Sequence, residues 1–264
     1  MILQTDITLF YHYKRVLLQA ATTNDKPMRA TVLATLLLAY CILAACTRSS
    51  PNAQLVQADS LMQKFPDSAL HFLEKIRPEE LNSLEDRAYY ALLVTQVQDK
   101  NYIFQENDSL IRIAVQYYDS IKSTSMQAKA HYYWGCIWRN REIYPQALSR
   151  FFTAISYAQK ASDHKLTGYI YNNIANLYFL QKLYEQADSI YQITETIAVQ
   201  EKDSGLWADA LSQQGMIAID RGKEYYHEAE QKILHAFKIS RHIAQKKMVA
   251  KTAYSLSLLY GRMN

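Results

Sequence analysis

The sequence predicts an all-α solenoid of antiparallel helix pairs. Three observations predict it: the chain of 264 residues has only 6 glycines and 5 prolines, its apolar residues follow helical spacing, and small residues recur in register about every 40 residues. Hydrophobic residues make up 49% and charged residues 20% of the chain. That balance supplies a packed core and excludes a disordered chain.

The N-terminal region contains one apolar run, at residues 30–45, which follows Arg29. Its 16 residues fall short of the roughly 20 that a helix needs to span a bilayer, and they suit the core of a cleaved signal peptide. The run ends in Leu43-Ala44-Ala45-Cys46, which resembles the lipobox of bacterial lipoproteins. This resemblance implies that Cys46 is the lipidation site and the mature N-terminus. The alternative is an ordinary signal peptide that ends at a cysteine by chance.

The predicted signal peptide divides the chain into four parts. Met28-Arg29 supplies the start and the basic residue that a signal peptide needs, so the residues before it are expected to be a non-native or disordered extension. The alternative is a long basic segment that belongs to the signal itself. The expected parts are this extension at 1–27, a lipoprotein signal peptide at 28–45, a linker at 46–52 and a helical repeat domain at 53–264 with an incomplete last repeat.

Charge and cysteine content narrow the function classes. Four basic and two acidic residues precede Cys46, which leaves 25 of the 29 basic and 23 of the 25 acidic residues after it. This near-neutral balance argues against nucleic acid as a partner.

Cys136 then remains as the one unmodified cysteine, so no disulfide framework forms within a mature chain. Its helical position between Trp134 and Trp138 predicts a buried small residue and not a reactive thiol.

Small residues form three columns at intervals of 40 or 42 residues. Where two helices cross closely, a side chain larger than alanine would push their axes apart. Aromatic residues follow the small ones at fixed spacing, as Trp138 and Phe151 do. One helix pair buries only part of its apolar surface, so pairs must stack to complete a core. The columns are Gly135, Ala175 and Gly215 in the first helices, then Ala147, Ala187 and Ala229, and Ala154, Thr194 and Ala236, in the second helices.

These columns resemble the tetratricopeptide repeat (TPR), whose signature is W-x₂-L-G-x₂-Y, then A-x₃-F, then A. The best match is Trp134-Gly135-x₂-Trp138, followed by Ala147-x₃-Phe151 and Ala154. The third unit departs from this signature, because Ala218 stands in the aromatic column and two extra residues occur around Lys223-Glu224. The period exceeds the family value of about 34 residues, which indicates longer helices and loops. The resemblance implies a right-handed superhelical solenoid and favours TPR over armadillo or HEAT repeats.

Weaker units flank these three. Residues 53–64 predict a first helix, and a second restarts near Pro66 with Asp67 or Ser68 as its cap. Residues 84–100 and 108–121 predict another pair. At the far end, residues 251–262 predict a first helix with Ser257 and Tyr260 in the repeat columns. A capping helix and a truncated product are both open interpretations of that unpaired helix.

The chain offers no pattern typical of catalysis. It contains no G-x-S-x-G, no P-loop and no H-E-x-x-H. His235 and His242 share a helical face without a cysteine or carboxylate at ligand spacing, and Gln231 stands where a zincin motif beginning at His227 would need its second histidine. We therefore expect a protein that is not an enzyme, with no catalytic residues, no metal and no cofactor.

The first helices of a repeat array line a concave surface, and helical geometry predicts which side chains face it. Asn172 and Asn176 lie four residues apart and are predicted to bracket a peptide amide; bonding within the array is the alternative. Tyr132 and Cys136 occupy the positions where the family's carboxylate clamp needs asparagine and lysine, which argues against that clamp. The predicted partner-binding residues are Tyr132, Arg139, Asn140, Asn172, Asn176 and Phe179, and the same rule adds Cys136, Leu180, Ser212, Met216, Ile219 and Asp220.

Together these features predict a membrane-tethered TPR lipoprotein that acts as a scaffold or adaptor in the cell envelope of a Gram-negative bacterium, at the outer membrane or the periplasmic face. Its partner is expected to be a protein or peptide in the concave groove. The lipid would provide the membrane contact, and nucleic acid is not expected. The alternative is the N-terminal sensor part of a TPR-containing signalling or transcription-regulating membrane protein. The sequence does not identify the partner, the leaflet or the oligomeric state.

Overall fold

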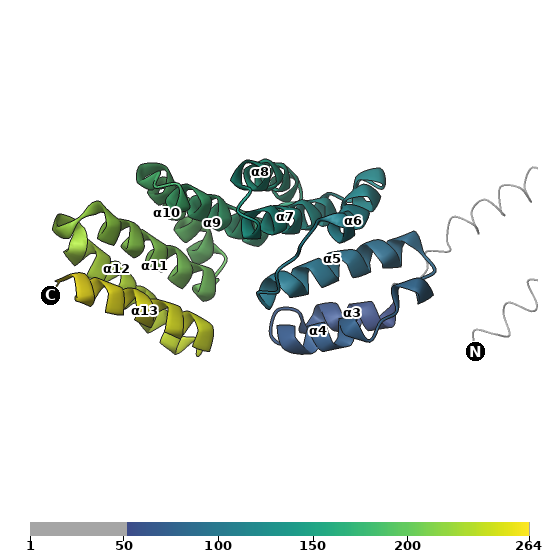
Figure 1. Cartoon of the computed structure of the whole chain (residues 1–264), viewed down its shortest axis with the longest axis horizontal. Helices are drawn as coiled ribbons and strands as arrows, with labels where there is room; N and C mark the ends of the chain where they lie inside the picture. Colours follow the sequence, from purple (N-terminus) through teal and green to yellow (C-terminus); the bar gives the residue numbers. More distant parts are fainter. Residues whose placement is uncertain (1–51, 264) are drawn as a thin grey trace, which may run out of the picture. The chain divides into compact units, whose positions relative to one another are not determined.

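The computed structural model describes residues 52–263, and all regular structure in that range is helical (Figure 1). The prediction of an all-α chain is confirmed there. The predicted extension at 1–27, the signal peptide at 28–45 and the lipidation site Cys46 lie outside the described residues. No helix between residues 52 and 263 is long and apolar enough to cross a membrane.

The helices alternate as first and second members of antiparallel pairs. Each helix packs on its neighbours in chain order, and successive first helices also contact one another, which is the contact pattern of a repeat array. The first helices are α3 (Ala53–Leu61), α5 (Leu84–Lys100), α7 (Thr124–Asn140), α9 (His164–Leu180), α11 (Ser204–Arg221) and α13 (Lys246–Met263). The second helices are α4 (Pro66–Glu74), α6 (Ser109–Ser120), α8 (Tyr144–Lys160), α10 (Tyr184–Gln200) and α12 (Tyr226–His242), with short 3₁₀ turns η1 (Pro78–Glu80) and η2 (Lys223–Tyr225).

The predicted small-residue columns lie in the seams between paired helices. A Cβ atom built on Gly135 would lie 2.5 Å from the Phe151 ring, and one on Gly215 would lie 2.4 Å from the Cγ1 atom of Ile233. A Cβ atom at either position would therefore force these buried side chains to move. The remaining members are buried with 1% or less of their surface exposed: Ala147, Ala154, Ala175, Ala187, Thr194, Ala229 and Ala236. The columns, and the reason given for them, are confirmed.

One turn geometry repeats through the array. After the C-cap of most helices comes a residue in the left-handed region, with φ between 53° and 60°: Tyr102, Lys122, Glu142, Ser162, Lys182, Lys202 and Ala244. At the turn after α7, for example, the Glu142 N–H donates to the Arg139 carbonyl at 2.9 Å and the Ile143 N–H donates to the Trp138 carbonyl at 2.9 Å. Glycine usually occupies this position, because other residues meet a steric cost there. The repeated turn makes successive pairs alike.

Some helices begin with a side-chain cap and others do not. The carboxylates of Asp163 and Asp203 cap α9 and α11, accepting from the Leu166 and Leu206 N–H groups at 2.9 and 3.0 Å. The predicted cap of α4 by Asp67 or Ser68 is wrong, because both residues lie inside a helix that begins at Pro66 and whose N-cap makes no side-chain hydrogen bond.

The last two units of the array are irregular, as predicted for the region around Lys223-Glu224. The two extra residues lie in the three-residue turn η2, which follows Gly222, whose φ of 130° suits glycine. In α13, Thr252 and Ser255 are buried, with Oγ1 and Oγ at 3.2 and 3.3 Å from the hydroxyl oxygens of Ser240 and Ser212. Ser257, which stands in the small-residue column, is exposed. The side of α13 that matches the seam face of α7 therefore has no helix against it within the described range.

Candidate functional site

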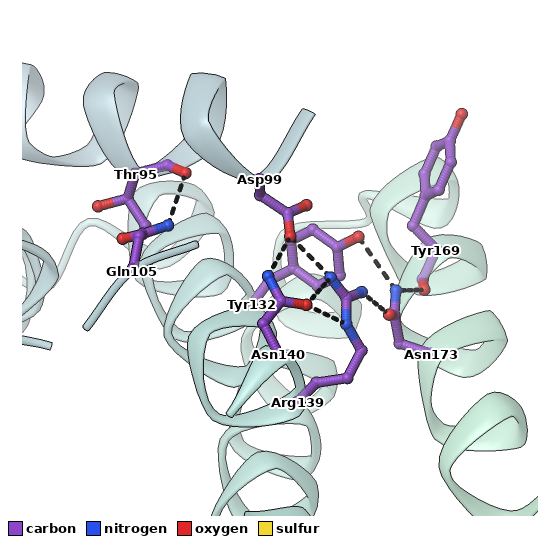
Figure 2. A network of polar contacts seen from close by, with 8 residues as sticks. All are labelled: Thr95, Asp99, Gln105, Tyr132, Arg139, Asn140, Tyr169 and Asn173. Atoms are coloured by element: carbon purple, nitrogen blue, oxygen red, sulfur yellow. Dashed lines mark hydrogen bonds and ion pairs between the residues drawn. The ribbon is translucent and has the colours of Figure 1, made fainter. Parts of the chain in front are cut away.

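The first helices form a face held together by polar side chains, and Figure 2 shows its best-connected part. Arg139 of α7 reaches both neighbours. Its Nη2 donates to Oδ1 of Asp99 in α5 at 2.7 Å, and its Nη1 donates to Oδ1 of Asn173 in α9. The Nδ2 of Asn173 donates in turn to the hydroxyl of Tyr132 at 3.1 Å and to the Tyr169 carbonyl at 2.9 Å. This network links three consecutive helix pairs.

The network changes the role expected of Arg139 and Asn140. The sequence predicts that Arg139 binds a partner, but its side chain is only 22% exposed and pairs with Asp99, which is 14% exposed. Asn140 accepts from Arg139 Nε at 3.0 Å and donates to Asp99 Oδ1 at 3.4 Å. Both residues therefore join neighbouring first helices, and their hydrogen-bonding groups are used within the chain.

Two other predicted groove residues of α7 are buried. Tyr132 is 7% exposed and Cys136 is fully buried, so neither presents a surface to a partner. Burial raises the pKa of the Tyr132 hydroxyl and of the Cys136 thiol well above their ordinary values, which keeps both groups neutral. The prediction of a buried Cys136 is confirmed. The prediction that Tyr132 lines an open groove is wrong, because packing between α7 and its neighbours covers its ring.

A second network joins α9, α11 and α13. The Nδ2 of Asn172 donates to Oδ2 of Asp209 at 2.8 Å, and Lys251 pairs with the other oxygen of Asp209. The Oδ1 of Asn172 is buried without a hydrogen-bond partner among the described residues. Its amide is therefore not available to bracket a peptide together with Asn176. Asn176 is half-buried and its side chain makes no hydrogen bond within the described chain.

The other residues that were predicted to line the groove differ in exposure. Phe179 is half-buried. Its ring centroid lies 6.0 Å from that of Tyr184, so the ring packs against α10, the second helix of the same pair. Leu180 is 50% exposed. Ser212 and Ile219 are buried, Met216 is half-buried, and Asp220 pairs with Arg262 at 3.0 Å. Of the predicted set, Leu180 is exposed and Asn176 is half-buried without a side-chain hydrogen bond, while most of the other residues are buried or pair within the array.

Sequence reasoning missed Asp99, Asn173, Asp209 and Lys251, which complete the two networks. Their partners lie 34 to 42 residues away, close to one repeat period. That near-constant separation is the signal that could have found them. A search for complementary polar residues one period apart would pair Asp99 with Arg139 and Asp209 with Lys251.

Chemistry-bearing clusters are few. Between residues 52 and 263, no group of three or more histidine, cysteine, aspartate or glutamate side chains could hold a metal ion. His235 packs edge-on against Trp207, with ring centroids 5.0 Å apart, and His227 contacts Gln231 at 3.0 Å.

Solved structures identify the architecture. A structure of a single-substitution variant of the putative kinesin light chain with nearly identical TPR-like repeats from Podosopora anserina is 14% identical, with a TM-score of 0.51 over 74% of this chain and 96% of that one. The fold is TPR-like. A second structure of that protein gives a TM-score of 0.50 at the same identity and coverage. No protein-family model and no curated protein matches the sequence. The prediction of a TPR-like fold is confirmed.

Proposed function

We propose that this TPR-like chain is a protein-interaction scaffold whose partner binds along the first-helix face. The observation that carries the proposal is the pair of polar networks, which tie α5 to α9 and α9 to α13 and hold the first helices in one arrangement. A surface that is ordered before binding loses little entropy when a partner docks. Asn176 and Leu180 offer an amide and an apolar side chain on that surface.

Affinity capture with the full chain tests this proposal. The site variant combines Asn176→Ala with Leu180→Ala, because neither side chain takes part in the networks. The control is Phe152→Ala on α8, where a side chain of comparable exposure, 52%, lies on a second helix. We expect the site variant to lose partners that the control retains. Equal capture by the two variants contradicts a role for this face.

We further propose that the scaffold is tethered to a membrane of the cell envelope. Supporting this is the resemblance of Leu43-Ala44-Ala45-Cys46 to a lipobox after an apolar run of signal-peptide length. Acyl chains stabilise membrane attachment by about 0.8 kcal/mol per buried CH₂ group, so several chains would retain the domain. Growth with labelled palmitate should label the chain and leave Cys46→Ser unlabelled. Label in both proteins would contradict lipidation at Cys46.

The alternative, a sensor part of a signalling protein, makes a different prediction. It requires coding sequence in frame after the Asn264 codon that includes an apolar span of roughly 20 residues. A stop codon directly after Asn264 in the genome favours the adaptor.

A further inference from the structure

The loop between α5 and α6, residues 101–108, carries an apolar tip formed by Tyr102, Ile103 and Phe104. These side chains are 79%, 38% and 61% exposed. The loop is held on both sides of the tip. Asn101 Nδ2 donates to the Pro66 carbonyl at 3.2 Å. Gln105 Nε2 donates to the Thr95 carbonyl at 3.4 Å, a bond that Figure 2 shows. Three large apolar side chains held in water at consecutive positions are typical of an interaction surface.

One lysine contacts this tip, and two more lie near the end of α5 that leads to it. The Nζ of Lys247, in the first turn of α13, lies 5.0 Å from the centroid of the Tyr102 ring. Lys100 ends α5 directly before the loop; burial lowers its pKa, an effect that Asp99 opposes and Lys165 of α9 reinforces. Lys165 itself is 57% exposed. The ends of α5, α9 and α13 therefore bring three ammonium groups towards one region of the array.

The carboxylates of this region are largely used inside the chain. Asp99 is occupied by Arg139, and Asp203, 10% exposed, accepts from Lys165 at 3.0 Å, from the Tyr169 hydroxyl at 2.9 Å and from a backbone N–H. These hydrogen bonds help to lower the pKa of Asp203 against the opposing effect of burial, so it stays ionised where it is. The exposed loop carboxylate is Glu106. Lys100 and Lys247 pair with no carboxylate among the described residues, so positive charge exceeds that of Glu106 here, whereas the part of the chain after Cys46 is nearly neutral.

We infer that the apolar tip of residues 102–104, together with Lys100, Lys165 and Lys247, is a docking surface for an acidic protein segment that carries a large apolar side chain beside its carboxylates. This inference rests on the proposed scaffold function and names the chemistry of one partner. The apolar side chain would cover the tip, and the carboxylates would meet three ammonium groups. Lys247 lies over the Tyr102 ring, Lys165 pairs with Asp203, which is 10% exposed, and Lys100 donates to Oε1 of Gln63 at 3.1 Å. Complementary charge adds to the rate of encounter and to specificity, while the apolar contact adds affinity.

Selection of short random peptides on the full chain tests the inference. Enriched sequences should combine aspartate or glutamate with an adjacent aromatic or aliphatic residue, and their binding should weaken as ionic strength rises. Fluorescence anisotropy with an enriched peptide should give a roughly tenfold weaker Kd for Lys247→Glu and for Phe104→Ala. The matched controls are Lys238→Glu on α12 and Phe152→Ala on α8, both exposed, which should leave Kd unchanged.

The outcomes separate this inference from the scaffold proposal. Failure to enrich any peptide, enrichment of basic or uncharged peptides, or an unchanged Kd in both variants overturns it. Phosphatidylglycerol vesicles form a second arm: if they bind in a Lys247-dependent manner and acidic peptides do not, the surface contacts lipid and the inference is wrong. If Asn176 and Leu180 prove necessary for protein capture while Lys247→Glu and Phe104→Ala have no effect, the scaffold function stands and only the docking surface falls.

Discussion

The seams inside helix pairs and the face along the first helices are stabilised in different ways. In the seam between α7 and α8, hydrogen at Gly135 lets the Phe151 ring pack against the backbone of α7. On the first-helix face, Asp99, Arg139 and Asn173 connect three helices by charge-assisted hydrogen bonds. The seam depends on shape and tolerates no added volume. The face depends on complementary polar groups and leaves some side chains free for a partner.

The largest effect is expected from filling a seam. Gly215→Val would place carbon within 2.4 Å of Ile233 and 3.2 Å of the Ala229 carbonyl oxygen, which is backbone and cannot turn aside. We expect a loss of roughly 3 kcal/mol, measured as a lower midpoint of urea unfolding. Gly261→Val is the matched control, because nothing lies within 4 Å of a Cβ there. Similar losses in both variants would mean that the seam is not closely packed at Gly215.

Breaking the first-helix network should lower the free energy of unfolding by less than filling a seam does. Arg139→Met removes the partner of Asp99, which is 14% exposed, and should lower the free energy of unfolding by about 2 kcal/mol, less than for a fully buried pair. Adding Asp99→Asn should recover part of the loss, because the unpaired charge is then gone. Arg221→Met, which loses only a surface contact with the Tyr225 ring, serves as control. A double variant as unstable as the sum of the single ones would contradict direct coupling.

A pH effect of moderate size is expected at the joint of α6, α7 and α8. Burial lowers the pKa of His131, Asp119 of α6 opposes this, and Arg150 of α8 reinforces it; the Nδ1 of His131 has no hydrogen-bond partner among the described residues. The folded state therefore binds its proton less tightly than the unfolded state. The contribution of His131 is fully present above pH about 6.5 and is lost as the pH falls below that value.

His131→Phe keeps an aromatic ring between Trp134 and Tyr157, whose centroids lie 6.1 and 5.6 Å from that of His131. The variant should flatten the pH dependence of the free energy of unfolding below pH about 6.5. Urea unfolding at a series of pH values measures this. An unchanged slope would assign the pH dependence to other groups.

The smallest effect is expected at the turns. Lys182 has φ of 60°, and Lys182→Gly should raise the free energy of unfolding by about 0.5–1 kcal/mol, because glycine adopts this conformation without a steric cost. The control Lys129→Gly lies within α7 and should lower it by about 1 kcal/mol. Thermal unfolding of the two variants should shift in opposite directions. A shared direction would contradict the turn geometry.

The contrast between seam and face also explains what the sequence could predict. Gly135, Ala147 and Phe151 lie within one helix pair and return with the repeat, so their role follows from spacing alone. The polar side of the first helices does not repeat by residue type: Arg139 meets Asp99, whereas Asn172 meets Asp209. Helical geometry placed these side chains on the correct helices but could not tell which of them bond to a neighbouring repeat.

Site-specific photo-crosslinking tests most directly whether the first-helix face binds partners. A photoreactive amino acid is placed in the full chain at Asn176 of α9 or, as the matched position on the second helix of the same pair, at Thr196 of α10, which is exposed. After irradiation in the producing cells, we predict crosslinked protein adducts from position 176 and few or none from position 196. Adducts from position 196 alone would contradict the account.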